Sequence, residues 1–147
     1  MKPPVSTIPV LLFLSMLAIS SCVTRGPFFQ ELEPQEQGMA IIYLFAQWNI
    51  AANSLYPIKA NGDPLVKLVD GEYYPFRIAP GDVTFEIDTT AREKERLVLH
   101  AESGQTYFVQ VIRMRYGGKL KLLTEEQAIH LITPCRLVVD TPEHRLR

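Results

Sequence analysis

Short apolar runs alternate with turn residues through most of the chain, and their lengths are those of β-strands. Residues 39–46 are apolar throughout, which predicts a central strand buried on both faces. Val83, Phe85 and Ile87 alternate with polar residues, which predicts a strand with one solvated face. The pattern therefore indicates a mainly β fold.

Three glycine-containing turns are predicted to connect these strands. Asp70-Gly71 separates the runs 64–69 and 72–78, and both turn residues tolerate positive φ, so we expect a β-hairpin. Ser103-Gly104 turns the chain between 97–102 and 106–116. Gly117-Gly118 then reverses it into 119–123.

The C-terminal part carries a helix signal. Thr124 to Gln127 fit a capping box, in which the threonine hydroxyl and the glutamine side chain each satisfy a backbone N–H group. A helix of about two turns should end near Ile132, because Pro134 cannot continue it. Residues 136–139 are expected to return as an edge strand.

Together these elements predict an immunoglobulin-like antiparallel β-sandwich of about seven strands with one short C-terminal helix. The sandwich should span residues 39–140, and a charged tail should span 141–147. Tyr107, at the start of the strand after Ser103-Gly104, is expected to bond through its hydroxyl to the corner backbone, as in such sandwiches.

The N-terminus has the pattern of a secretory signal. Lys2 precedes an apolar run at 8–19, which is shorter than the roughly 20 residues that span a bilayer. Residues 19–22 read Ile-Ser-Ser-Cys and resemble a lipobox, in which the cysteine is lipidated and becomes N-terminal after cleavage. We therefore predict a lipoprotein signal peptide at 1–21, a lipid anchor at Cys22, and a tether at 22–38.

Two alternatives stay open in this region. Ala18-x-Ser20 also suits a general signal peptidase, and Cys22 would then be a thiol able to pair with Cys135 in an oxidising compartment. Phe28 and Phe29 could dock on the domain or dip into a membrane interface. Val23 occupies the position where aspartate retains lipoproteins in the inner membrane, so its presence favours the outer membrane.

Composition and charge narrow the function classes. The 147 residues are 47% apolar, which suits one globular domain after the signal. Lys plus Arg number 15 against 16 Asp plus Glu, so the broad basic excess of a nucleic-acid-binding protein is missing.

The residues that could carry catalysis or bind metal are scattered. The three histidines show no metal-ligand spacing, and no cofactor motif occurs, so we expect neither metal nor cofactor. Cys135 with His130 could form a nucleophilic pair, although an unpaired cysteine more often packs as a small hydrophobe. The acidic residues of 82–88 suit a solvated strand face better than a calcium loop. Trp48 could stack on a sugar or, as we expect, cap the core.

One cluster of cations suggests a binding surface. If Gly117-Gly118 form a two-residue turn, Tyr116 faces Lys119, Met114 faces Lys121, Arg115 faces Leu120 and Arg113 faces Leu122. Four cations would then surround Tyr116 at one hairpin tip, as a patch for an anionic lipid or an acidic partner. The alternative is an edge hairpin whose charges prevent sheet-to-sheet aggregation. The candidate patch comprises Arg113, Arg115, Tyr116, Lys119 and Lys121.

The order of these motifs resembles a known family. AIIYLF at 40–45, KLVDGEYYPFRIAPGDVTFEI at 67–87, HAESGQTYFVQV at 100–111 and LLTEEQAIHLI at 122–132 are similar to bacterial lipoproteins assigned to domain of unknown function 2846. The middle part also resembles PEGA-type surface modules. The resemblance implies an immunoglobulin-like fold and a lipoprotein address, and it supplies no catalytic residues.

The sequence thus predicts a non-enzymatic lipoprotein of the cell envelope whose β-sandwich binds a protein or envelope component, for instance through a sheet edge. The rival hypothesis is a small-ligand-binding module or an enzyme, with a pocket built from residues far apart in the sequence.

Overall fold

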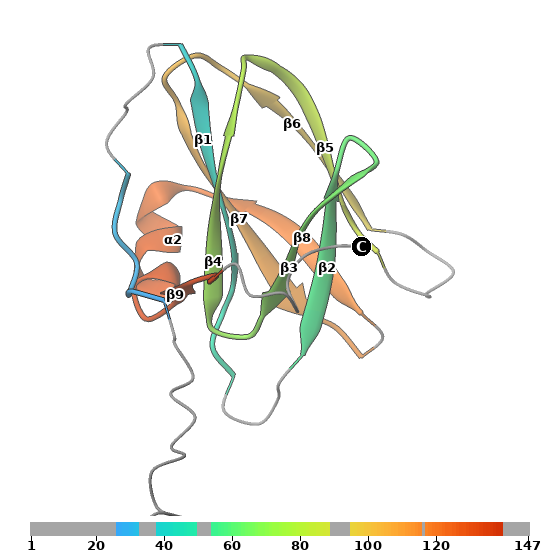
Figure 1. The fold of residues 1–147 in the computed structure, drawn as a ribbon, viewed down its shortest axis with the longest axis vertical. Coiled ribbons are helices and arrows are strands. Elements are labelled where there is room, and N and C mark those ends of the chain that lie inside the picture. Colours follow the sequence, from blue (N-terminus) through green and yellow to red (C-terminus); the bar gives the residue numbers. More distant parts are fainter. Residues whose placement is uncertain (1–25, 33–37, 50–53, 89–94, 116, 140–147) are drawn as a thin grey trace, which may run out of the picture.

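Two β-sheets and one helix make up the part of the chain that the structure, a computed structural model, describes: residues 26–32, 38–49, 54–88, 95–115 and 117–139 (Figure 1). In chain order the elements are β1 (Ala40–Ala46), β2 (Leu55–Ala60), β3 (Asp63–Val69), β4 (Glu72–Ile78), β5 (Gly81–Ile87), β6 (Arg96–Ala101), β7 (Thr106–Arg113), β8 (Gly118–Leu123), α2 (Glu125–Ile132) and β9 (Arg136–Leu137).

The sheets have five and four strands, in the orders β8-β7-β1-β4-β9 and β3-β2-β5-β6. The predicted β-sandwich with a short C-terminal helix is confirmed. Within the described residues two strand pairs are parallel, β1 with β7 and β4 with β9, and the others are antiparallel. The order differs from that of constant-type immunoglobulin domains because β1 lies between β4 and β7.

β1 is buried on both faces, as its apolar sequence predicts. Ile42 and Leu44 belong to the core between the two sheets. Tyr43 and Phe45 belong to a second core on the outer face of the five-stranded sheet, which includes Ala128 of α2. The helix therefore forms a third layer, and β1 lies at the centre of the molecule.

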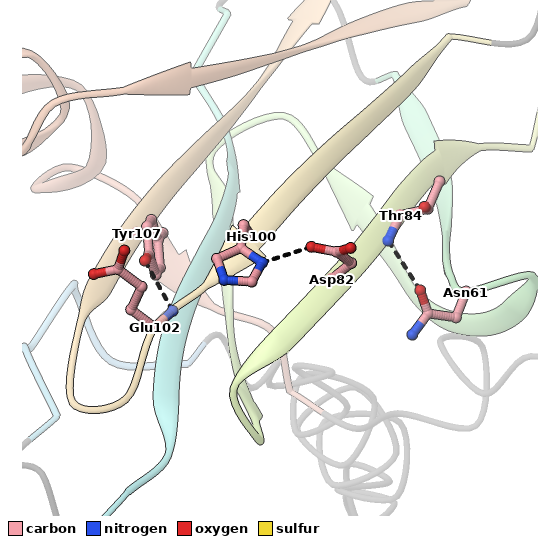
Figure 2. Close-up of polar contacts among 6 residues, drawn as sticks. All are labelled: Asn61, Asp82, Thr84, His100, Glu102 and Tyr107. Carbon is pink, nitrogen blue, oxygen red and sulfur yellow. Dashed lines mark hydrogen bonds and ion pairs between the residues drawn. The ribbon is translucent and has the colours of Figure 1, made fainter.

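The predicted corner tyrosine is confirmed. The Tyr107 hydroxyl accepts a hydrogen bond from the backbone N–H of Glu102 at 3.0 Å, across the turn that carries the chain from β6 in one sheet to β7 in the other (Figure 2). The alternation of β5 is also confirmed, because Val83, Phe85 and Ile87 are all buried.

The helix begins where its sequence predicts. The Thr124 hydroxyl accepts from the Gln127 N–H at 3.4 Å, and the Gln127 side chain accepts from the Thr124 N–H at 3.3 Å, so the capping box is formed. The helix ends at Ile132, before Pro134. The edge strand predicted at 136–139 is present as β9, which is shorter than expected.

The hairpin predicted at Asp70-Gly71 is wrong. This turn joins β3 and β4, which belong to different sheets, so it carries the chain from one layer to the other. The tight hairpin lies one strand earlier, where Ala60 pairs with Asp63 around Asn61 and Gly62. Those two residues have φ of 52° and 89°, as a two-residue turn with left-handed backbone requires.

The predicted register of the β7–β8 hairpin is also wrong. Arg113 pairs with Gly118, and Ile112 pairs with Lys119, so residues 114–117 form the connection. Gly118 lies within β8 instead of in a two-residue turn. A Cβ added to Gly118 would lie 2.9 Å from Ile87 Cδ1, so this glycine is needed for close packing between the sheets.

The start of the described chain docks on the outer face of the five-stranded sheet. The Phe29 N–H donates to the Cys135 carbonyl, and the Leu137 N–H donates to the Pro27 carbonyl. The Phe29 ring packs edge-on at 5.2 Å, centroid to centroid, against both Tyr43 and Tyr73. Of the two alternatives for these phenylalanines, docking is what the structure shows for Phe29, whereas the Phe28 side chain stays exposed. No helix among the described residues is long and apolar enough to span a membrane.

Candidate functional site

Cys22 and the rest of the predicted signal peptide lie outside the described residues, as does the tail at 141–147. Lipidation of Cys22 therefore stays a prediction. The docked segment begins at Gly26, only four residues after Cys22 in the sequence.

Cys135 is buried and carries a free thiol. Its sulfur lies 3.4 Å from the Leu131 carbonyl and 3.6 Å from the Ala46 carbonyl, as a donor to both. Burial raises the pKa of the thiol to about 12, against the opposing effect of a backbone hydrogen bond from Trp48. Because the thiolate is the nucleophilic form, this environment suits a packed core residue rather than the partner of His130 in catalysis.

Three of the four cations of the candidate patch are divided between two faces of the five-stranded sheet. Lys119 and Lys121 flank Leu120, which points into the core between the sheets, so both lysines point to the outer face of the five-stranded sheet. Arg113 follows the inward Val109 and Val111 and lies at the inner face near the end of β7. The prediction that all four cations surround one hairpin tip is based on the wrong β7–β8 register.

Two further members of the patch lie in or near the β7–β8 connection. Arg115 is an exposed residue of that connection, and Tyr116 is outside the described residues. Arg113 lies close enough to Tyr56, on the four-stranded sheet, to affect its ionisation. Burial raises the pKa of the Tyr56 hydroxyl, and the positive charge of Arg113 lowers it. Binding of an anionic partner to these residues stays a proposal.

The acidic residues of β5 and its C-terminal neighbour pair with separate cations. Asp82 Oδ1 lies 2.6 Å from His100 Nδ1 on β6, and this hydrogen bond raises the pKa of the His100 imidazole (Figure 2). The remaining pairs are Glu86 with Arg96 at 2.7 Å and Asp88 with Lys59 at 3.0 Å. This arrangement fits the solvated strand face that the alternation predicts. Across the described part of the chain, no group of three His, Cys, Asp or Glu side chains could hold a metal ion.

A stacked pair joins the docked segment to β9. Phe28 and Arg136 form an isolated antiparallel bridge, and the Arg136 guanidinium carbon lies 3.9 Å from the centroid of the Phe28 ring. Arg136 Nη1 also donates to the Gly26 carbonyl at 3.2 Å. A guanidinium above an aromatic face is a favourable cation–π contact, and here it places a charge and an exposed ring side by side.

Trp48 and Arg136 both contact Gly71. The Arg136 N–H donates to the Gly71 carbonyl, and a Cβ added to Gly71 would lie 3.6 Å from Trp48 Cβ. Trp48 keeps 57% of its surface exposed, so the expectation that it caps the core is wrong. The strand before it ends at Ala46, and the start of the Trp48 side chain lies beside Gly71.

Two more apolar residues lie at the same end of the sandwich. Leu55 pairs with Val69 at the start of β2, next to the Asp70-Gly71 turn that Trp48 contacts. Met114 follows β7, which runs parallel to β1 and so ends at the same level (Figure 1). We call this end the tether-end surface and define it by Phe28, Trp48, Leu55, Met114, Arg113 and Arg136.

The tether-end surface holds most of the exposed apolar side chains. Among the described residues, the exposed large apolar side chains are these four together with Val98 and Leu122. The exposed fractions of the four are 54% for Phe28, 57% for Trp48, 53% for Leu55 and 50% for Met114. No short-range signal in the sequence links Phe28 with Trp48. They come to the same end because Arg136 of β9 bridges Phe28 and bonds to Gly71, beside Trp48.

Comparison with known proteins adds no relative: no family model, no curated protein and no solved structure matches this chain.

Proposed function

We propose that this chain is a bacterial envelope lipoprotein, anchored by acyl chains on Cys22, whose β-sandwich binds a protein or another envelope component without catalysing a reaction. The observation that carries the proposal is the apolar run at 8–19 followed by Ile-Ser-Ser-Cys at 19–22. The resemblance to the lipoproteins of domain of unknown function 2846 supports it. Val23 favours the outer membrane as the location.

Acylation would supply the whole anchor. Each buried methylene group contributes about 0.8 kcal/mol, so several chains on one cysteine hold a protein stably where a single chain is marginal. The environment of Cys135 supports an anchor at Cys22 over a disulfide. The Cys135 thiol is free and buried in the core, where it donates to the Ala46 and Leu131 carbonyls.

A sheet edge is the proposed binding element, and β6 suits it best among the described edges. β3 contains Pro64, which lacks a backbone donor, and β9 is covered by residues 27–28. β8 presents Lys119 and Lys121, which discourage strand pairing.

β6 differs in the chemistry of its exposed side chains. Arg96 and His100 both pair with acidic residues of the neighbouring β5, so their charges are locally balanced. Between them lies Val98, which is 66% exposed. A strand added to this edge would gain backbone hydrogen bonds and an apolar contact at Val98.

Labelled palmitate tests the anchor directly. We expect incorporation into the wild-type chain and into Cys135→Ala, and complete loss of label in Cys22→Ala, because only Cys22 follows the signal. The label is measured on the purified protein after growth in radioactive or alkyne palmitate. Equal labelling of wild type and Cys22→Ala would refute the lipoprotein assignment.

Site-specific photo-cross-linking in cells tests the binding edge. A photoreactive side chain at Val98 is expected to give a discrete adduct with a partner, whereas the same group at Leu122, an exposed apolar position on β8, is expected to give none. The two positions match in chemistry and differ in the strand they report on. Identical adduct patterns at both, or none at Val98 in correctly anchored protein, would contradict binding at β6.

A further inference from the structure

The tether-end surface lies where the chain arrives from its proposed anchor. Gly26 is in contact with Leu137 and accepts a hydrogen bond from Arg136, beside the start of β4. A chain spans at most about 3.6 Å per residue, so the four residues from Cys22 to Gly26 reach about 14 Å. A seven-residue strand such as β1 is longer than that, at about 23 Å. The end of the sandwich that carries Gly26 is therefore held close to any bilayer in which Cys22 is anchored.

The side chains of this end suit the headgroup region of a bilayer. Trp and other amphipathic aromatic residues are enriched at membrane–water interfaces, where one part of the ring contacts apolar chains and the other contacts water. Trp48 and Phe28 are both more than half exposed there, and Leu55 and Met114 add apolar surface. Exposed apolar side chains gathered in one region mark sites of contact with proteins or membranes.

The same end also carries two basic residues that could contact lipid phosphates. Arg136 lies over the Phe28 ring, and Arg113 lies at the end of β7. The nearby carboxylates are satisfied within the protein: Asp70 accepts from the Ser54 N–H and the Tyr56 hydroxyl, and Glu72 accepts from the Val69 N–H. Arg113 and Arg136 are the basic groups of this end, and basic groups near an anionic leaflet are attracted to it.

We propose that the tether-end surface rests on the membrane, with the Trp48 indole and the Phe28 ring in the headgroup layer and the arginines at the phosphates. This inference rests on the proposed lipid anchor at Cys22. It adds a fixed orientation: the Asn61-Gly62 hairpin and the β6–β7 turn, which lie at the other end of the strands, point away from the bilayer (Figure 1).

The single tryptophan of the chain makes the orientation measurable. The experiment uses the mature, acylated protein in vesicles of phosphatidylethanolamine and phosphatidylglycerol, with iodide as an aqueous quencher and lipids brominated along the acyl chain as membrane quenchers. On vesicles, Trp48 fluorescence is expected to shift to shorter wavelength and to be quenched by brominated lipid. Its quenching by iodide should be several-fold weaker than in the reference sample, which is the protein in detergent-free solution after enzymatic removal of the acyl chains.

The matched control moves the probe without changing the anchor. In the double variant Trp48→Phe, Val98→Trp the tryptophan lies on β6, on the outer face of the four-stranded sheet. Its iodide quenching is expected to be the same on vesicles as in solution, and brominated lipid should not quench it.

The outcomes separate this inference from the proposed function. Acylated protein whose Trp48 remains as accessible to iodide on vesicles as in solution would overturn the orientation and leave the anchor intact. Protection of Trp48 only in native envelopes, and never on pure lipid, would assign the surface to a protein and equally overturn it. Acylation is measured separately by the palmitate label, and its absence would contradict the proposed anchor.

Discussion

Burial determines the chemistry of Cys135. The thiol is enclosed by β1, α2 and the start of β9, and its proton is shared with two carbonyl groups. The sequence alone left three roles open for this cysteine: disulfide partner, nucleophile or core residue. The choice depends on neighbours at positions 46 and 131, which no local pattern connects to position 135.

The raised pKa of Cys135 predicts a loss of stability at alkaline pH. The ordinary thiol pKa is 9.0, and the folded value is about 12. Between these values the unfolded chain has lost the proton and the folded chain keeps it, so the free energy of unfolding falls as pH rises. The contribution is complete below pH 9 and decreases by at most about 1.4 kcal/mol per pH unit above it.

Urea unfolding between pH 8 and pH 11 measures this effect in wild type and Cys135→Ala. The buried tyrosines, among them Tyr43 and Tyr73, also have raised pKa values because of burial, and they contribute in both proteins. The variant should be less stable at pH 8 because it leaves a cavity. The difference between the proteins should narrow with pH, and a constant difference would contradict the assignment.

Individual elements differ in how far the sequence determined them. The capping box of α2 and the alternation of β5 are local signals, and the structure contains both. The Asp70-Gly71 and Asn61-Gly62 turns carry equivalent residues, yet only the second closes a hairpin. A turn signal states that the chain reverses, and only the packing of the layers decides whether the flanking strands pair.

Gly118 shows the same limit for register. Two consecutive glycines suggest a two-residue turn, but Gly118 is needed because side chains of Tyr56, Ile87 and Val111 fill the space of its missing Cβ. A glycine required by packing and one required by backbone conformation look identical in a sequence. The predicted register of β7 and β8 is therefore wrong, and so is the predicted position of the cation patch.

The Asn61-Gly62 hairpin offers a clean test of backbone conformation. Gly62 has φ of +89°, and an added Cβ would meet nothing within 4 Å, so Gly62→Ala carries a conformational cost without a clash. We expect a loss of about 1 kcal/mol in the free energy of unfolding, measured by urea titration.

Asp63→Ala, one residue further on, is the control. Asp63 is exposed and has an ordinary strand backbone, so its replacement should change stability by less than about 0.5 kcal/mol. Equal effects of the two substitutions would show that the turn conformation is not what the hairpin depends on.

At the scale of the whole molecule, three layers explain both the core and the candidate surface. The two sheets enclose one core, while α2 and residues 26–32 enclose a second against the outer face of β1, β4 and β7. The mainly β class follows from local patterns, and the proposed N-terminal address rests on local patterns of the same kind. The tether-end surface does not, because its members come from the docked segment, the ends of β1 and β7, and the starts of β2 and β9.

The parallel pairing of β1 with β7 bears on the order of folding. Ile41 pairs with Thr106, about 65 residues later in the chain, so the central strand acquires this neighbour only after most of the domain is available. A chain exported from its N-terminus would present the wholly apolar β1 before β7 has emerged. Contacts so distant in sequence slow folding and leave hydrophobic strands exposed to aggregation. If the chain is exported as proposed, β1 is the segment that needs protection from aggregation until β7 arrives.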